Sequence, residues 1–202
     1  MAGTSDPGLW DRAAPTWDRR TAGLERRFMA EGRRWVTSRA RGRTLDVGIG
    51  TGANLPLYRH DVEVTGVDFS AGMLAEARRR ADELGRPVRL EQAGADRLPF
   101  PDDSFDTVVS TFVMCSVPSL DDALAEMVRV LRPDGQLLLA DHVASRVAAV
   151  RWVQRLMDLI TARQGEYWTR RPLDHLQGAG LRLVETQNHS LGIMEQLSAV
   201  PG

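Results

Sequence analysis

Strand-like and helix-like segments alternate through most of this chain, and this alternation constrains its fold more than any other feature. Short runs rich in aliphatic and β-branched residues predict five strands, at residues 43–48, 61–69, 87–93, 105–114 and 135–143. Amphipathic segments between them predict helices, at residues 70–84 and 119–131. Since strands that alternate with helices form a mostly parallel sheet with helices on both faces, we expect an α/β, Rossmann-like fold.

The two ends of the chain extend this central pattern. Residues 8–38 predict a helical segment that Pro15 divides, and residues 145–163 predict another long helix. A short helix and two closing segments follow. We therefore expect a single domain over residues 1–202 with four parts, namely an amino-terminal helical lid (1–40), a cofactor-binding core (41–143), substrate-shaping helices (144–180) and closing strands (181–202).

Composition narrows the classes of partner. The net charge is −1, and the 26 basic residues are all arginine without a dominant patch, so nucleic acid is not expected. The single cysteine, Cys115, rules out an internal disulfide and suits a reducing compartment. No apolar run approaches the roughly 18 residues of a membrane helix, and no secretion signal is recognisable. We expect a cytoplasmic protein with a small-molecule substrate; membrane contact is disfavoured but stays open, because the first helix is arginine-rich.

A glycine-rich turn follows the first predicted strand. Gly48, Gly50 and Gly52 alternate there, and ligands of parallel sheets bind at the carboxyl ends of the strands. Gly48, Gly50 and Ala53 also fit the loosened dinucleotide pattern G-x-G-x-x-A. Asp68 lies 20 positions after Gly48, where a carboxylate can bind the two hydroxyls of a ribose. An adenosine-type ligand is therefore expected, and a nicotinamide cofactor stays open at this point.

Three features separate the possible ligands. Asp46 stands two positions before Gly48, where a carboxylate suits an ammonium group and repels a pyrophosphate. After the third strand, Asp96 can accept from an exocyclic amine, and the Ala95 N–H can donate to a ring nitrogen. The turn itself carries no Lys or Arg and is not a P-loop. A ligand with an amine, a ribose and an adenine, but little phosphate, is S-adenosylmethionine.

The segments "LDVGIGTG", "VTGVDFSAGML", "AGADRLPFPDDSFDTVVS" and "VRVLRPDGQLLLADH", within residues 45–142, resemble the motifs of class I S-adenosylmethionine-dependent methyltransferases. The resemblance implies a seven-stranded, mostly parallel sheet whose last strand is antiparallel. It implies that Asp46 and the glycine turn hold the methionine moiety, that Asp68 holds the ribose, and that Met73 contacts the adenine. Many relatives carry Asp where this chain has Gly94, which shifts the adenine contact to Asp96. The expected contacts of the donor and its product S-adenosylhomocysteine are Asp46, Gly48, Gly50, Gly52, Asn54, Asp68, Phe69, Met73, Ala95, Asp96 and Cys115.

The stretch "STFVMCSVPSLDDALAEMVRVLRPDGQLLLADHV" resembles a branch with thiol S-methyltransferases, phosphatidylethanolamine N-methyltransferases and quinone C-methyltransferases. We take a heteroatom of a small apolar molecule as the first acceptor, a thiol before a hydroxyl or amine. A phospholipid amine or a quinone carbon is the alternative. A protein that binds the donor without transferring its methyl group, or a cyclisation catalyst, is the alternative of another class.

Two residues at the end of the fifth strand are the candidates for catalysis. His142 can serve as a general base or can be a structural histidine beneath the pocket. Asp141 can orient His142, bind an amine, or pair with an arginine. Methyl transfer needs no covalent intermediate, so Cys115 is expected in the pocket wall rather than as a nucleophile. No metal site is predicted.

The expected substrate contacts come from the remaining segments. Ser116 follows the fourth strand, and Trp17 stands where the family segment usually has tyrosine. Trp168 belongs to "GEYWTRRP", whose aromatic side chains suit an apolar acceptor. In the same stretch, Glu166 is expected near the rim of the pocket, where it either binds the substrate or is a charged side chain exposed to solvent.

Overall fold

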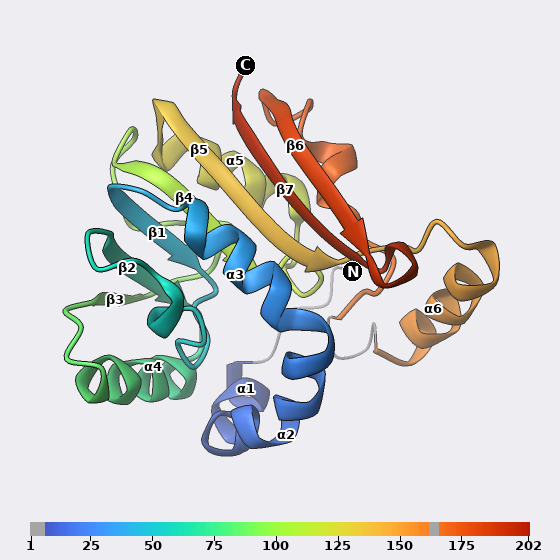
Figure 1. Cartoon of the computed structure of the whole chain (residues 1–202), viewed down its shortest axis with the longest axis horizontal. Helices are drawn as coiled ribbons and strands as arrows, with labels where there is room; N and C mark the ends of the chain where they lie inside the picture. The colour runs from blue at the N-terminus through green and yellow to red at the C-terminus, as the bar shows by residue number, and fades with distance from the viewer. Residues whose placement is uncertain (1–6, 162–165) are drawn as a thin grey trace.

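The computed structural model describes residues 7–161 and 166–202 and contains one seven-stranded sheet (Figure 1). The strand order is β3-β2-β1-β4-β5-β7-β6. The strands are β1 (Arg43–Val47), β2 (Glu63–Asp68), β3 (Arg89–Gln92), β4 (Phe105–Thr111), β5 (Leu131–His142), β6 (Leu181–His189) and β7 (Met194–Pro201). The first five strands pair in parallel, and β7 pairs antiparallel with both β5 and β6. The predicted fold, including its antiparallel last strand, is confirmed.

Helices cover both faces of the sheet. They are α1 (Pro7–Ala13), α2 (Trp17–Leu24), α3 (Ala30–Arg39), α4 (Ala71–Glu83), α5 (Leu120–Val130) and α6 (Ala148–Thr161). One apolar cluster packs α5 against the sheet through Leu124 and Met127. A second cluster on the other face includes Val36 of α3 and Ala81 of α4. Burial on both faces explains why the central strands are nearly continuous apolar runs.

The starts of two helices follow the sequence signals. Ser70 precedes α4, and its Oγ accepts a hydrogen bond from the Met73 N–H at 3.1 Å. Ser119 precedes α5 and accepts from the Asp122 N–H at 3.2 Å. Each serine satisfies one of the free N–H groups of a first helical turn. Because α4 begins directly after β2, its amino end lies at the carboxyl edge of the sheet.

The amino-terminal segment is helical, as predicted, and is interrupted twice. Pro15 lies in a 3-10 turn, Ala14–Thr16, between α1 and α2. A π-helical turn, Glu25–Met29, joins α2 to α3. Asp11 of α1 accepts from the Ser70 hydroxyl at 2.6 Å and from the Gly72 N–H at 2.8 Å. The first helices are thereby attached to the start of α4, beside the carboxyl edge of the sheet.

Several boundaries differ from the sequence prediction, and the fourth strand, expected over 105–114, ends at Thr111. The fifth strand begins at Leu131 rather than at residue 135, because Leu131 pairs with Phe105 before a register shift in the β4–β5 ladder. The helix expected over 145–163 begins at Ala148, and its predicted end lies outside the described residues. Among the residues that are described, no helix is both long enough and apolar enough to cross a membrane.

Candidate active site

A cavity of about 480 Å³ lies at the carboxyl edge of the sheet, between the glycine turn and the amino-terminal helices. Core residues that line it include Gly48, Gly50, Asp68, Phe69, Met73, Thr111, Phe112, Val113 and Ser116. Trp10, Trp17, Glu25 and Arg33 line it from the amino-terminal segment. The cavity therefore brings together residues predicted from the turn, from the end of β2 and from the first helices.

A larger hollow, of about 1030 Å³, lies at the opposite edge of the sheet. It is lined by the starts of strands, including Arg43, Glu63 and Arg89. Parallel sheets bind their ligands at the carboxyl ends of the strands. The smaller cavity is therefore the candidate site, although it has less than half the volume.

The glycine turn requires glycine at its first position. Gly48 has a φ of +71°, and a Cβ there would lie 2.4 Å from a Val113 methyl carbon. Gly50 has a φ of +57°, and a Cβ there would meet only the Gly48 carbonyl at 4.0 Å. Gly48 thus allows the turns that follow β1 and β4 to approach one another, whereas Gly50 leaves the main chain open. A ligand can lie directly against the backbone at Gly50.

Asp68 ends β2 and faces the cavity with a nearly buried carboxylate. Its Oδ2 accepts from the Gly50 N–H and its Oδ1 from the Ser70 N–H, both at 2.9 Å. Burial raises the pKa of Asp68, and these N–H groups oppose that rise. Each carboxylate oxygen has a second lone pair. The carboxylate is therefore oriented by the backbone and keeps the capacity to accept two hydroxyl donors.

Asp46 lies beneath the turn and is fully buried. Its Oδ2 accepts from Asn54 Nδ2 at 3.0 Å and from the Tyr58 hydroxyl at 2.9 Å. Its Oδ1 has no hydrogen-bond partner among the described residues. Burial raises the pKa of Asp46 to about 6, against the hydrogen bonds from Asn54 and Tyr58. Asp46 does not itself line the cavity, but a buried carboxylate with an unpaired oxygen is costly and would attract a cation bound nearby.

Arg33 is a site residue that the sequence did not reveal. It is 9% exposed and donates from Nη1 to Asn54 Oδ1 at 3.1 Å and to Thr111 Oγ1 at 2.7 Å. Its Nε lies 3.1 Å from both carboxylate oxygens of Glu25. The neighbouring Arg34 is exposed. Several arginines occur in this helical segment, so only the tertiary structure distinguishes the one that faces the cavity.

The turn after β4 is strained and is held by Asp141. Phe112 adopts a φ of +61°, which is unfavourable for a side chain of this size. The buried Asp141 Oδ2 accepts from the Val113 N–H at 3.0 Å and from the Met114 N–H at 2.8 Å. Its Oδ1 accepts from the His142 N–H at 2.8 Å, and burial raises the pKa of Asp141. Asp141 therefore orients the backbone that forms one wall of the cavity, and its described partners are amides rather than an arginine.

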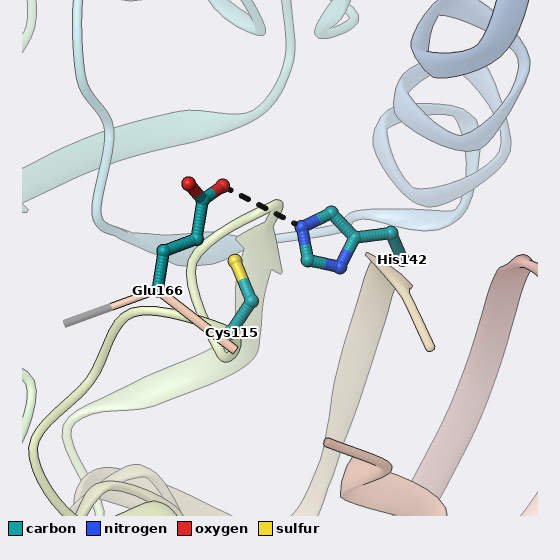
Figure 2. Close-up of side chains that lie close together, drawn as sticks. All are labelled: Cys115, His142 and Glu166. Atoms are coloured by element: carbon teal, nitrogen blue, oxygen red, sulfur yellow. Dashed lines mark ion pairs between the residues drawn. The ribbon is translucent and has the colours of Figure 1, made fainter. Parts of the chain in front are cut away.

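His142 lies behind this turn, in a cluster with Cys115 and Glu166 (Figure 2). Its ring stacks on the Trp168 ring, with the two ring centroids 4.5 Å apart and the two planes at an angle of 1°. Its Nε2 is 3.8 Å from Glu166 Oε1. Burial alone would lower the pKa of His142, but Cys115, Glu166 and Asp141 oppose it, so that the pKa lies above its usual value. A positioned imidazole with adjacent carboxylates is a candidate acid–base group.

The remaining predicted residues occupy different places. Burial raises the pKa of the Cys115 thiol to about 11, so the thiol is protonated at neutral pH and is a poor nucleophile. Trp17 and Ser116 line the cavity, whereas Cys115, His142 and Trp168 lie outside its lining. Ala95 and Asp96 also lie outside it; Ala95 packs against the apolar cluster under α5, and Asp96 is exposed.

Sequence comparison supports the same class of protein. Residues 45–139 match the family model described as "Methyltransferase domain". The chain is 50% identical over 105 residues to a phosphatidylethanolamine N-methyltransferase of Cereibacter sphaeroides, covering 51% of this chain and 52% of that one. It is 35% identical over 132 residues to the ubiquinone/menaquinone biosynthesis C-methyltransferase UbiE of Geobacter sulfurreducens, covering 61% of this chain and 51% of that one. The chain spans about half the length of these curated relatives.

Comparison with solved structures agrees with the sequence match. The YcgJ protein of Bacillus subtilis aligns with a TM-score of 0.67 at 27% identity, covering 79% of this chain and 73% of that one. The matched domain, the strand order and the carboxyl-edge cavity all agree with the class I S-adenosylmethionine-dependent methyltransferases, which this chain resembles. Within that class it resembles the phosphatidylethanolamine N-methyltransferases and the quinone C-methyltransferases.

Proposed function

We propose that this protein transfers the methyl group of S-adenosylmethionine to an apolar, membrane-held acceptor. The observation that carries the donor assignment is the arrangement of two carboxylates, Asp46 and Asp68, around a glycine turn that borders a 480 Å³ cavity. A pyrophosphate would be repelled by these carboxylates, whereas an ammonium group and a ribose would be stabilised by them.

Each part of the donor has a matching group in this chain. The unpaired Oδ1 of Asp46 suits the methionine ammonium electrostatically, and the Arg33 guanidinium at the cavity wall suits the methionine carboxylate. Asp68 suits the ribose hydroxyls. Phe69 and Met73 provide apolar surface for the adenine. Ala95 and Asp96 remain proposed contacts of the adenine edge, which would need the donor to extend beyond the cavity lining.

When bound, the donor supplies an activated methyl group on a sulfonium, and direct displacement needs an aligned acceptor and little water. Trp10 and Trp17 of the amino-terminal segment line the cavity, and their ring centroids are 5.1 Å apart. We propose that this segment acts as a lid. Ser116 lies at the cavity wall and would contact the acceptor. We propose that His142, in its neutral form, accepts a proton at Nε2 from an acceptor that extends beyond the cavity lining, with Glu166 stabilising the imidazolium. Trp168 holds the imidazole ring through stacking.

The exposed face of α6 favours a membrane-held acceptor over a soluble thiol. Trp152, Leu159 and Ile160 are 62%, 72% and 67% exposed, and α6 lies at the periphery of the molecule (Figure 1). The only buried residue of α6 is Gln154, which accepts from the Ser145 N–H at 2.8 Å and donates to the Val143 carbonyl at 2.9 Å. The helix is thus attached through a polar residue and presents apolar side chains outward, as interfacial helices do.

The charges of α6 fit an anionic lipid surface. Arg151 and Arg155 are its basic residues, and Asp158 is its one acidic residue. The Asp158 carboxylate is turned toward the protein, where it accepts from the Trp168 N–H at 2.5 Å and from the Thr169 hydroxyl. Arginines beside exposed apolar side chains are typical of helices that bind anionic membranes. The names of the relatives, a phosphatidylethanolamine N-methyltransferase and a quinone C-methyltransferase, also favour acceptors of this kind over a thiol.

The decisive experiment is methyl transfer from labelled S-adenosylmethionine to competing acceptors. Vesicles with anionic lipid would carry either phosphatidylethanolamine or a demethylated quinone, and a hydrophobic thiol would be offered in solution. We expect label in a vesicle-held acceptor, and we expect Ile160→Glu to reduce it while sparing donor binding. Leu84→Glu, at an exposed residue of a distant surface, is the matched control. Label only in the thiol would refute the membrane-held acceptor. Donor binding without any methylated product would instead favour a non-methylating protein or a cyclisation catalyst.

A further inference from the structure

Three side chains of metal-binding type converge at the end of β5. Cys115 and His142 are buried, and Glu166 is partly exposed. One donor atom from each lies within 4.8 Å of the other two. Figure 2 shows the Cys115 thiol and the Glu166 carboxylate directed toward the His142 ring. We propose that these residues form a binding site for a thiophilic divalent cation of the zinc class.

The geometry is close to what such a cation needs. Zinc binds sulfur at about 2.3 Å and nitrogen or oxygen at about 2.0–2.2 Å, so neighbouring donor atoms in a tetrahedral site are roughly 3.4–3.7 Å apart. His142 Nε2 and Glu166 Oε1 are already 3.8 Å apart. No two donor atoms of the cluster are more than 4.8 Å apart, so each pair has to approach by at most about 1 Å to reach tetrahedral distances. Three protein ligands leave a fourth position for water, as in zinc sites that are not purely structural.

The ligand-bearing segments are fixed before any cation binds. The Tyr167 N–H donates to the Cys115 carbonyl at 2.9 Å, which ties the segment of Glu166 to the turn after β4. The His142 ring stacks on Trp168, two residues after Glu166. Asp141 Oδ1 accepts from the His142 backbone N–H at 2.8 Å, which fixes the main chain of this ligand. His142 Nδ1 lies 3.9 Å from the same oxygen and has no hydrogen-bond partner among the described residues, so stacking is what holds the ring.

Binding would have a defined chemical consequence. Cys115 would bind as the thiolate and release its proton to solvent, and His142 would bind as the neutral imidazole. An imidazole nitrogen that holds a cation cannot accept a proton. On the proposed function, in which His142 Nε2 is the base, the cation would therefore inhibit methyl transfer. The binding site itself does not depend on that function.

The test is titration of the metal-free full-length protein with Co²⁺, a spectroscopic substitute for zinc, followed by competition with Zn²⁺. We expect one bound ion per chain, a near-ultraviolet thiolate-to-cobalt band, and displacement of that band by Zn²⁺. Cys115→Ser should abolish the band. Glu166→Gln, at a partly exposed side chain, should keep the fold and weaken binding by about tenfold or more.

His175→Ala is the matched control, because the His175 Nδ1 pairs with Asp121 Oδ1 at 2.6 Å on the surface. This variant should bind Co²⁺ as the wild type does. Absence of a stoichiometric ion, or binding that Glu166→Gln leaves unchanged in a folded protein, would overturn the proposal. Binding with no effect on methyl transfer would leave the cation site standing and would contradict His142 as the base.

Discussion

The two halves of the carboxyl edge hold their polar side chains in different ways. At β1 and β2, Asp46 and Asp68 accept from groups that lie between 2 and 18 residues away in the sequence. At β5, His142 faces Glu166 and Trp168, which belong to the segment beyond α6. The two carboxylates of the donor half are therefore held by local contacts, whereas His142 in the acceptor half depends on a distant segment of the chain. This difference predicts separable effects of substitution.

The largest effect should come from the acceptor half. His142→Ala removes the proposed base, and we expect turnover to fall by about 100-fold or more while the affinity for S-adenosylmethionine stays within about twofold. Initial-rate kinetics and calorimetry on the same variant measure the two quantities, with His175→Ala as control. An unchanged turnover would make His142 a structural residue. An equal loss of donor affinity would erase the distinction between the halves.

The next effect should appear in the donor half. Asp68→Ala removes charge-assisted hydrogen bonds to the ribose, and we expect donor binding to weaken by about 2–3 kcal/mol, or roughly 30- to 150-fold. Calorimetric affinity for S-adenosylhomocysteine is the readout. Asp61→Ala is the control, because the exposed Asp61 carboxylate pairs only with Arg59 among the interactions described. Donor affinity equal to that of the wild type would reject the ribose assignment.

Asp141 tests the boundary between the halves, because it lies next to the last residue of β5 but orients the turn after β4. Asp141→Asn replaces charged acceptors of three backbone N–H groups, and we expect a loss of about 1–3 kcal/mol in the free energy of unfolding. Denaturant unfolding measures it. A stable variant with strongly reduced turnover would instead give Asp141 a direct role in catalysis.

The smallest effect should be a pH dependence in the donor half. The pKa of Asp46 is raised to about 6, and a cationic ligand nearby would lower it, so donor affinity should fall as the pH drops through about 6. At pH 5 the expected weakening is at most about tenfold. Without ligand the sign is opposite for stability: a raised folded-state pKa means that protonation of Asp46 favours the folded chain as the pH falls. Asp46→Asn should flatten both profiles, and a pH-dependent affinity that persists in this variant would exclude Asp46 as its source.

The fold and the donor half could be predicted from the sequence because their signals are local. The alternation of strands and helices predicts the sheet, and the segment from Gly48 to Asp68 contains only the glycine turn, a 3-10 turn at Leu55–Leu57 and β2. Arg33 was not predicted, since its contacts with Asn54 and Thr111 span 21 and 78 residues. The convergence of Cys115, His142 and Glu166 was missed for the same reason. The sequence contains no pattern from which one could predict that the segment after α6 packs against the turn after β4.

Within the donor half, the contacts predicted for the adenine edge, Ala95 and Asp96, lie outside the cavity lining. Gly94 precedes Asp96 closely enough that a Cβ at Gly94 would lie 2.5 Å from Asp96 Oδ1. The Asp96 carboxylate thus folds back over Gly94 in this structure and lies outside the cavity lining. Its proposed contact with the adenine remains a prediction for the bound state.

The central claim is that the cavity between the glycine turn and the amino-terminal helices binds S-adenosylmethionine. Calorimetric titration with S-adenosylmethionine and S-adenosylhomocysteine, with NADH as the competing nucleotide, tests it most directly. The account predicts one site per chain for the first two ligands and no heat of binding for NADH. Binding of NADH with neither of the other two would contradict the assignment of Asp46 and Asp68, and the glycine turn would then be a dinucleotide site.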